Sequence, residues 1–160
     1  MIVDFSELPK TSKVWIFQSN RSLNDEDLQS IQTKLTEFLS QWTAHGADLK
    51  AGFEFRYKRF IVVALDQNEN KATGCSIDTL IHFVQAIETA FSIDLLDKMN
   101  VSYKQGEFIA YKNLVDFKTM AKKRSVSPKT IVFNNLVVDK ADYQENWEIP
   151  ASESWHARFF

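Results

Sequence analysis

The sequence is short of glycine, proline and cysteine, and each shortage excludes a class of protein. Its 160 residues include only 4 Gly, 3 Pro and 1 Cys. Because 44% of the residues are hydrophobic and Gly and Pro are so few, the sequence is not that of a collagen-like, low-complexity or disordered chain. A single cysteine excludes a framework of internal disulfides, and it also excludes a zinc site built from several thiolates.

The sequence also lacks long apolar runs, a secretory leader and an excess of charge of one sign. The longest unbroken apolar run covers residues 60–65, far short of the ~20 residues of a membrane span, so we expect no membrane insertion. The first residues show no basic stretch followed by an apolar one, which favours a cytoplasmic location. The 19 basic and 21 acidic side chains are evenly spread, so we expect no nucleic-acid partner.

The few glycines do not have the spacing of a nucleotide-binding loop. A phosphate loop needs GxxxxGK[ST], because its backbone amides surround the phosphates and its lysine reaches the terminal ones. Gly46 and Gly52 are six positions apart rather than five, and Phe53 stands where the lysine is required. The pattern GxGxxG is missing as well.

Two segments carry apolar residues at spacings of three and four, which predicts two long amphipathic helices. Asn24 is the expected N-cap of the first helix, and His45 with Gly46 is its expected end. Ser76 is the expected N-cap of the second. The two apolar stripes are Leu28, Ile31, Leu35, Phe38, Leu39 and Trp42, and Ile77, Leu80, Ile81, Val84, Ile87 and Phe91.

Other segments have the residue pattern of strands. Residues 14–17 are apolar on both faces, which predicts a central strand, and residues 53–65 are expected to form a hairpin that turns near Lys58. A second hairpin is expected over residues 100–112, a short helix after Asn113, and a last strand at residues 130–133. This order predicts a single α+β domain over residues 1–160. We expect a ferredoxin-like (split β-α-β) antiparallel sheet with two main helices, plus an added C-terminal hairpin and helix.

Six strings of the sequence resemble those of a family of small uncharacterised bacterial proteins. They are VWIFQSNR, QWTAHG, TGCSID, DKMN, TIVFNNLV and SWHARF, and the resemblance runs from Lys13 to the last residues. Several members carry the label "ABC transporter ATPase", so the resemblance implies an ATPase-related function, which is the third of our functional hypotheses. It implies no particular catalytic residues.

The first functional hypothesis concerns the start of the predicted second helix. Cys75 is expected beside free helix amides that would stabilise a thiolate, and Gly74 would let a ligand approach closely. The same amides could instead bind an anion, and Cys75 could equally be a small buried side chain. We therefore expect a protein that binds a small molecule or anion through Gly74, Ser76 and Asp78. If it is an enzyme, we expect it to use the Cys75 thiol as its nucleophile.

A nucleophilic thiol needs a base within hydrogen-bonding distance, and His45 and His156 are the candidates. Each also has an ordinary interpretation, since His45 would suit the negative end of a helix and His156 would pack among aromatic residues. These two histidines, Cys75 and Asp78 are suitable ligand types for zinc or iron, but the spacings of known metal motifs are missing. We expect no metal and no other cofactor.

The second hypothesis is a protein-interaction module or homodimer that uses the aromatic C-terminus. Residues 155–160 include Trp155, Phe159 and Phe160, which is too aromatic for a free tail, so we expect the segment to dock on the body or on a partner. A basic run precedes it and is expected to be a solvated face, since no aromatic residues alternate with it. The run consists of Lys118, Lys122, Lys123, Arg124 and Lys129.

Overall fold

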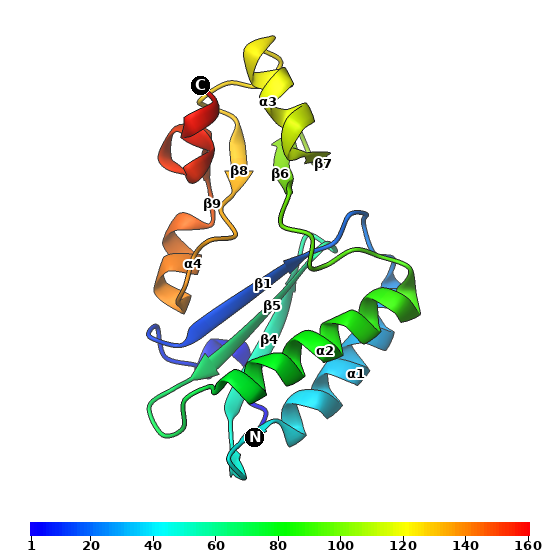
Figure 1. The fold of residues 1–160 in the computed structure, drawn as a ribbon, viewed down its shortest axis with the longest axis vertical. Helices are drawn as coiled ribbons and strands as arrows, with labels where there is room; N and C mark the ends of the chain where they lie inside the picture. Colours follow the sequence, from blue (N-terminus) through cyan, green and yellow to red (C-terminus); the bar gives the residue numbers. More distant parts are fainter. The chain divides into compact units, whose positions relative to one another are not determined.

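The computed structural model describes all 160 residues, and the chain has the α+β class that the sequence predicted (Figure 1). It divides into two compact units. The first comprises Met1–Leu96 and Val138–Ala141, and the second comprises Asp97–Val137 and Asp142–Phe160. The single domain over residues 1–160 stays a prediction. None of the helices combines the length and the apolar character that a membrane crossing requires.

The sheet of the first unit has three antiparallel strands in the order β1-β5-β4, with β1 at Lys13–Gln18, β4 at Lys50–Arg56 and β5 at Phe60–Asp66. Val63 of β5 lies between Trp15 and Phe53 of its two neighbours. The central strand is therefore β5, whose residues 60–65 are all buried, and the expectation that residues 14–17 form the central strand is wrong. Apolar residues on both faces do not require a central position when other chain segments cover the edge of the sheet.

Two helices pack on one face of this sheet, and Figure 1 shows them side by side. They are α1 at Asp25–Gln41 and α2 at Gly74–Phe91. Asn24 caps α1 as predicted, because its side chain accepts a hydrogen bond of 2.7 Å from the Asp27 amide. The buried residues of this interface are Ile31, Leu35 and Leu39 of α1, Leu80, Val84 and Ile87 of α2, and Ile61, Val63 and Leu65 of β5.

The N-cap of α2 lies three residues before the predicted one. Thr73, not Ser76, is the N-cap, since its hydroxyl accepts a hydrogen bond from the Ser76 amide at 3.1 Å. The Ser76 hydroxyl in turn accepts from the Thr73 amide at 2.7 Å, which completes a capping box. Both residue types can cap a helix, so the sequence pattern alone did not distinguish them.

Two tight turns hold side chains in the left-handed region. The hairpin predicted near Lys58 is confirmed, and Tyr57 and Lys58 occupy its turn with φ of 56° and 51°. The expected end of α1 is wrong, because α1 ends at Gln41 and a small hairpin of β2 (Thr43–Ala44) and β3 (Ala47–Asp48) follows. His45 and Gly46 form the turn of that hairpin with φ of 52° and 78°, as a two-residue hairpin turn with both φ positive requires.

Both edges of the first sheet are covered by other parts of the same unit. Ile2 forms a parallel bridge with Ala51 of β4, and the 3₁₀ helix η1 (Phe5–Glu7) follows. On the other edge, Asp139 forms an antiparallel bridge with Lys13 of β1. The next residue, Lys140, is buried, and its ammonium group donates hydrogen bonds to the carbonyl oxygens of Phe5, which begins η1, and of Leu8, which follows η1.

The second unit has a four-stranded antiparallel sheet in the order β7-β6-β8-β9. The predicted hairpin is confirmed as β6 (Asn100–Gln105) and β7 (Phe108–Asn113), and β8 (Ile131–Phe133) and β9 (Glu148–Pro150) complete the sheet. Asn113 caps α3 (Leu114–Lys122), as its side chain accepts from the Asp116 amide at 2.8 Å. The helices η2 (Ala151–Glu153) and η3 (Trp155–Phe159) also belong to this unit, whereas α4 (Lys140–Asn146) begins in the first unit and continues into the second from Asp142.

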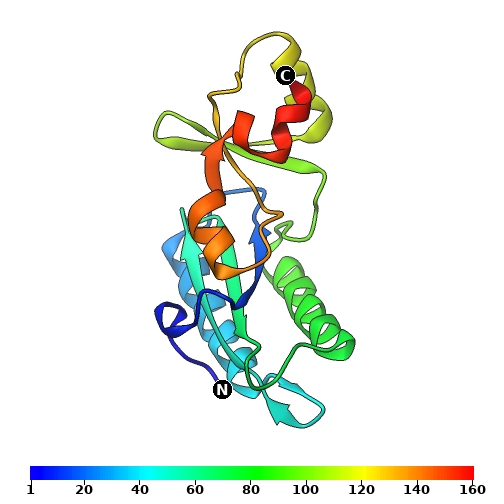
Figure 2. The ribbon, with the colours of Figure 1, turned by 90° about the vertical axis from the view of Figure 1, so that its left-hand side faces the viewer.

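The aromatic C-terminus packs on its own unit, one of the two outcomes expected for it. Phe117 of α3 is fully buried and lies 5.9 Å from the ring centroids of both His156 and Phe159. Figure 2 shows η3 beside α3. Trp155 and Phe159 are partly buried and Phe160 remains 43% exposed. Most of the aromatic surface of this segment is therefore covered within the unit.

Candidate functional site

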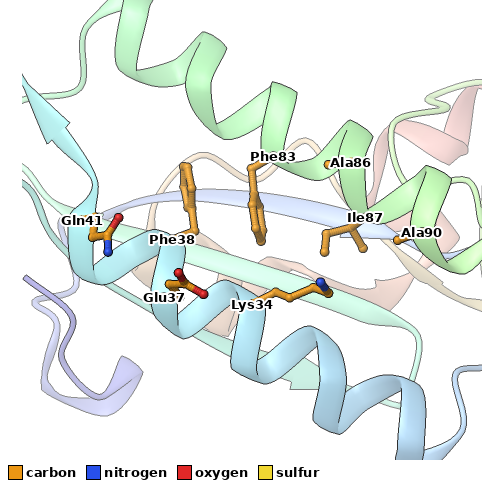
Figure 3. Close-up of a pocket in the computed structure, with 8 residues that line it drawn as sticks. All are labelled: Lys34, Glu37, Phe38, Gln41, Phe83, Ala86, Ile87 and Ala90. Carbon is orange, nitrogen blue, oxygen red and sulfur yellow. The ribbon is translucent and has the colours of Figure 1, made fainter.

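A groove of about 290 Å³ opens between α1 and α2, within the first unit (Figure 3). Each helix gives it residues three and four positions apart, which lie on one helical face. The lining residues are Lys34, Glu37, Phe38 and Gln41 of α1, and Phe83, Ala86, Ile87 and Ala90 of α2.

A pair of stacked phenylalanine rings crosses the groove. The rings of Phe38 and Phe83 face each other with centroids 4.5 Å apart and planes 18° apart. Phe38 also lies 6.0 Å from Trp42, whose indole N–H donates a hydrogen bond of 2.9 Å to the carbonyl of Ser76. This hydrogen bond joins the end of α1 to the start of α2, so the aromatic wall of the groove is held from both helices.

The two sides of the groove differ in polarity. On α2 the surface is apolar, with Ile87 buried and Ala86 and Ala90 exposed. On α1 the exposed side chains are polar, and Lys34 reaches along the groove toward Ala90 in Figure 3. Lys34 makes no ion pair within the chain. The groove is also lined by the Glu37 carboxylate, from which the Lys34 ammonium is directed away in Figure 3. The arrangement can hold a flat apolar group against the rings and a negative charge at the Lys34 ammonium.

The residues predicted to bind a ligand at the start of α2 are differently placed. Cys75 and Asp78 are exposed, and the position of a Cβ on Gly74 meets nothing within 4 Å. Ser76 is buried, and its hydroxyl donates to the Thr73 carbonyl at 3.0 Å while it accepts from the Thr73 amide. Its hydroxyl is therefore occupied by the capping box, and these four residues do not line the groove.

The two candidate bases occupy unlike environments. His45 is exposed in the β2–β3 turn and makes no hydrogen bond with Cys75. His156 belongs to the second unit and is fully buried, with its Nδ1 2.7 Å from the Ser154 hydroxyl and no partner at Nε2. Burial, together with the nearby charge of Arg158, lowers the pKa of His156 from its usual 6.5 to about 4.

Two further features bear on the sequence predictions. No three side chains of the types His, Cys, Asp and Glu gather where they could hold a metal ion. The basic side chains at and after the end of α3 are all exposed, as expected of a solvated face.

The groove itself was not predicted from the sequence. Phe38 was assigned to the apolar stripe of the first helix, and Phe83 lies beside the stripe of the second. A large aromatic residue at the margin of each stripe is the signal that could have indicated it, since such residues are only half covered by the core. Pairing them requires knowledge of how the two helices lie together.

The sequence matches no protein-family model, no curated protein and no solved structure. The class that the fold defines is a two-unit α+β protein with an aromatic groove between two helices.

Proposed function

We propose that the protein binds a small molecule with a flat apolar body and one negatively charged group in the groove between α1 and α2. The observation that carries the proposal is the half-buried Phe38–Phe83 stack beside the unpaired Lys34. Ligand pockets usually span about 300–1,000 Å³, so a groove of about 290 Å³ suits a small ligand.

The two interactions contribute differently to binding. A ring placed against the phenylalanine pair gains about 0.5–1.5 kcal/mol beyond its buried area. The exposed Lys34 ammonium adds a weaker attraction that salt screens. We therefore expect the aromatic contact to set most of the affinity, and the charge to set the preference for an anionic ligand.

Filling the groove tests the proposal directly, with the fluorescence of anilinonaphthalene sulfonate as the readout on the folded full chain. The Ala86→Phe substitution places a ring in the groove from an exposed position and should abolish the fluorescence increase. Gln85→Phe is the matched control, because it adds the same ring to the same helix outside the groove. Equal binding by the two variants would contradict the proposal.

The charge is tested separately. Lys34→Gln should weaken binding of the sulfonate and remove its salt dependence, while binding of the uncharged anilinonaphthalene stays unchanged. Lys71→Gln removes the same charge from an exposed loop residue and should leave both probes unaffected.

An anion or a reactive thiol at the start of α2 remains a second candidate, which the exposed position of Cys75 favours. The amides of Gly74 and Cys75 precede the first hydrogen-bonded amides of the helix, so they are open to a ligand. The thiol hypothesis predicts that Cys75 reacts with iodoacetamide faster than free glutathione at neutral pH. A rate no faster than that of glutathione would reduce Cys75 to an ordinary surface residue.

The finer fold assignment is also a proposal: the first unit is a ferredoxin-like sheet in which a short bridge replaces the fourth strand. Its support is the order β1-β5-β4 with helices after β1 and β5, and the bridge of Asp139 beside β1, where the fourth strand would pair. The cytoplasmic location, the family resemblance and an ATPase-related function stay predictions. Calorimetry with ATP and magnesium tests the last of them.

A further inference from the structure

A second groove of about 630 Å³ lies in the first unit, away from the one between α1 and α2. The N-terminal segment, α1 and β4 form it. Its apolar part includes Phe53 and Phe55, two half-buried rings with centroids 5.5 Å apart. Three carboxylates line it, from Asp4, Glu7 and Glu54, and no basic side chain does. We call it the acidic groove.

Two of these carboxylates have no internal partner. Asp4 and Glu7 are exposed and form no ion pair, whereas Glu54 lies 3.7 Å from Arg56. Asp4 directly precedes η1 and Glu7 ends it.

The second unit carries a face of complementary character on α3. Val115, Lys118 and Lys122 lie three and seven residues apart on one side of the helix, while Phe117 and Ala121 are buried on the other. Val115 is 73% exposed although it is apolar. Lys118 and Lys122 are four residues apart, so they lie ~6 Å apart along the helix axis.

We propose that the exposed face of α3 of one copy docks in the acidic groove of a second copy. Val115 then covers the rings of Phe53 and Phe55, and Lys118 and Lys122 lie at Asp4 and Glu7. The apolar contact removes Val115 from water, and the charges fix the orientation. Every copy carries both surfaces, so the contact joins the helix of one copy to the groove of another. This proposal does not depend on the ligand of the groove between α1 and α2.

Light scattering coupled to size exclusion tests this self-association on the full chain. We expect a mass above that of the monomer in low salt and a shift to monomer in about 0.5 M salt, where the screening length falls to a few ångströms. A wild-type chain that stays monomeric in low salt at the highest soluble concentration overturns the proposal.

Charge reversal gives the sharper experiment. Asp4→Lys with Glu7→Lys should yield a monomer, and so should Lys118→Glu with Lys122→Glu, because like charges then meet at the contact. An equimolar mixture of the two variants should associate, since each variant carries the charges that the other now needs. Lys71→Glu with Lys98→Glu is the control for net charge and should associate as the wild type does. Circular dichroism verifies that each variant is folded, and a mixture of folded variants that stays monomeric overturns the proposal.

Discussion

The two units bury a polar side chain in opposite ways. Lys140 belongs to the first unit and is 5% exposed, and its ammonium donates hydrogen bonds to the carbonyls of Phe5 at 2.9 Å and Leu8 at 2.7 Å. His156 of the second unit is fully buried, but only one of its ring nitrogens has a partner. A cation can be buried when carbonyl dipoles replace its water, whereas a half-satisfied imidazole is stable only in its neutral form.

The hydrophobic cores of the two units also differ, in size and in composition. The core of the first unit is mostly aliphatic and lies between two long helices and a sheet. The core cluster around Phe117 in the second is smaller and mixes aliphatic residues with rings, with Tyr103 5.7 Å and Phe159 5.9 Å from Phe117. Because this cluster is small, we expect loss of the Phe117 ring to remove a large share of its packing.

The largest effect is expected from Phe117→Ala. Removing a fully buried ring should lower the free energy of unfolding by about 4 kcal/mol, as the ring leaves a cavity. Leu35→Ala is the matched truncation in the first unit and should cost about 3 kcal/mol. Urea unfolding followed by amide NMR separates the units. If Phe117→Ala shifts the transitions of both units equally, the chain unfolds as the single domain predicted from the sequence.

The second prediction concerns acid. Because the pKa of His156 is about 4 in the folded chain and 6.5 ordinarily, its neutral form is retained in the fold while the unfolded chain takes up a proton. The contribution of His156 to the free energy of unfolding is therefore complete above about pH 6.5, and about 3 kcal/mol of it is lost as the pH falls to about 4. The urea concentration at the midpoint of unfolding should fall with decreasing pH across this range in the wild type, and this dependence should be lost in His156→Phe. His82→Phe, at an exposed position, should keep it.

The third prediction concerns the buried lysine. Lys140→Met keeps most of the side-chain volume and removes the ammonium donor, so the Leu8 carbonyl loses this hydrogen bond and the Phe5 carbonyl keeps the one from the Leu8 amide. We expect a cost of about 2 kcal/mol in urea unfolding. The N-terminal segment should also exchange its amide protons faster. Lys10→Met at an exposed position is the control, and equal stability of the two variants would show that these hydrogen bonds contribute nothing.

The smallest effects are expected at the helix caps, one in each unit. Thr73→Ala and Asn113→Ala should each cost about 1 kcal/mol, because each removes the acceptor for an amide at the start of its helix. Hydrogen exchange should increase in the first turn of α2 for the first variant and of α3 for the second. Exchange that rises along the whole chain in either variant would indicate a global rather than a local effect.

The sequence indicated the elements of the fold better than their arrangement. The caps Asn24 and Asn113 and the turn near Lys58 were predicted correctly, because each depends on residues that are neighbours along the chain. The turn at His45 was missed, since Gly after a helical stripe fits a helix end as well as a hairpin turn. The groove between Phe38 and Phe83 could not be predicted, because it depends on long-range packing of two helices.

The covered edges of the first sheet also have a consequence for solubility. Strand edges expose unpaired amides and carbonyls that can recruit strands of other molecules and begin aggregation. Two bridges pair part of these edge groups within the chain: Ile2 with Ala51 on β4, and Asp139 with Lys13 on β1. The covering residues, Ile2 and Asp139, come from opposite parts of the sequence. Gly52 keeps the first of them close, since a Cβ there would lie 2.5 Å from the Val3 carbonyl oxygen. A side chain at that position would push the segment away and uncover β4 to strands of other molecules.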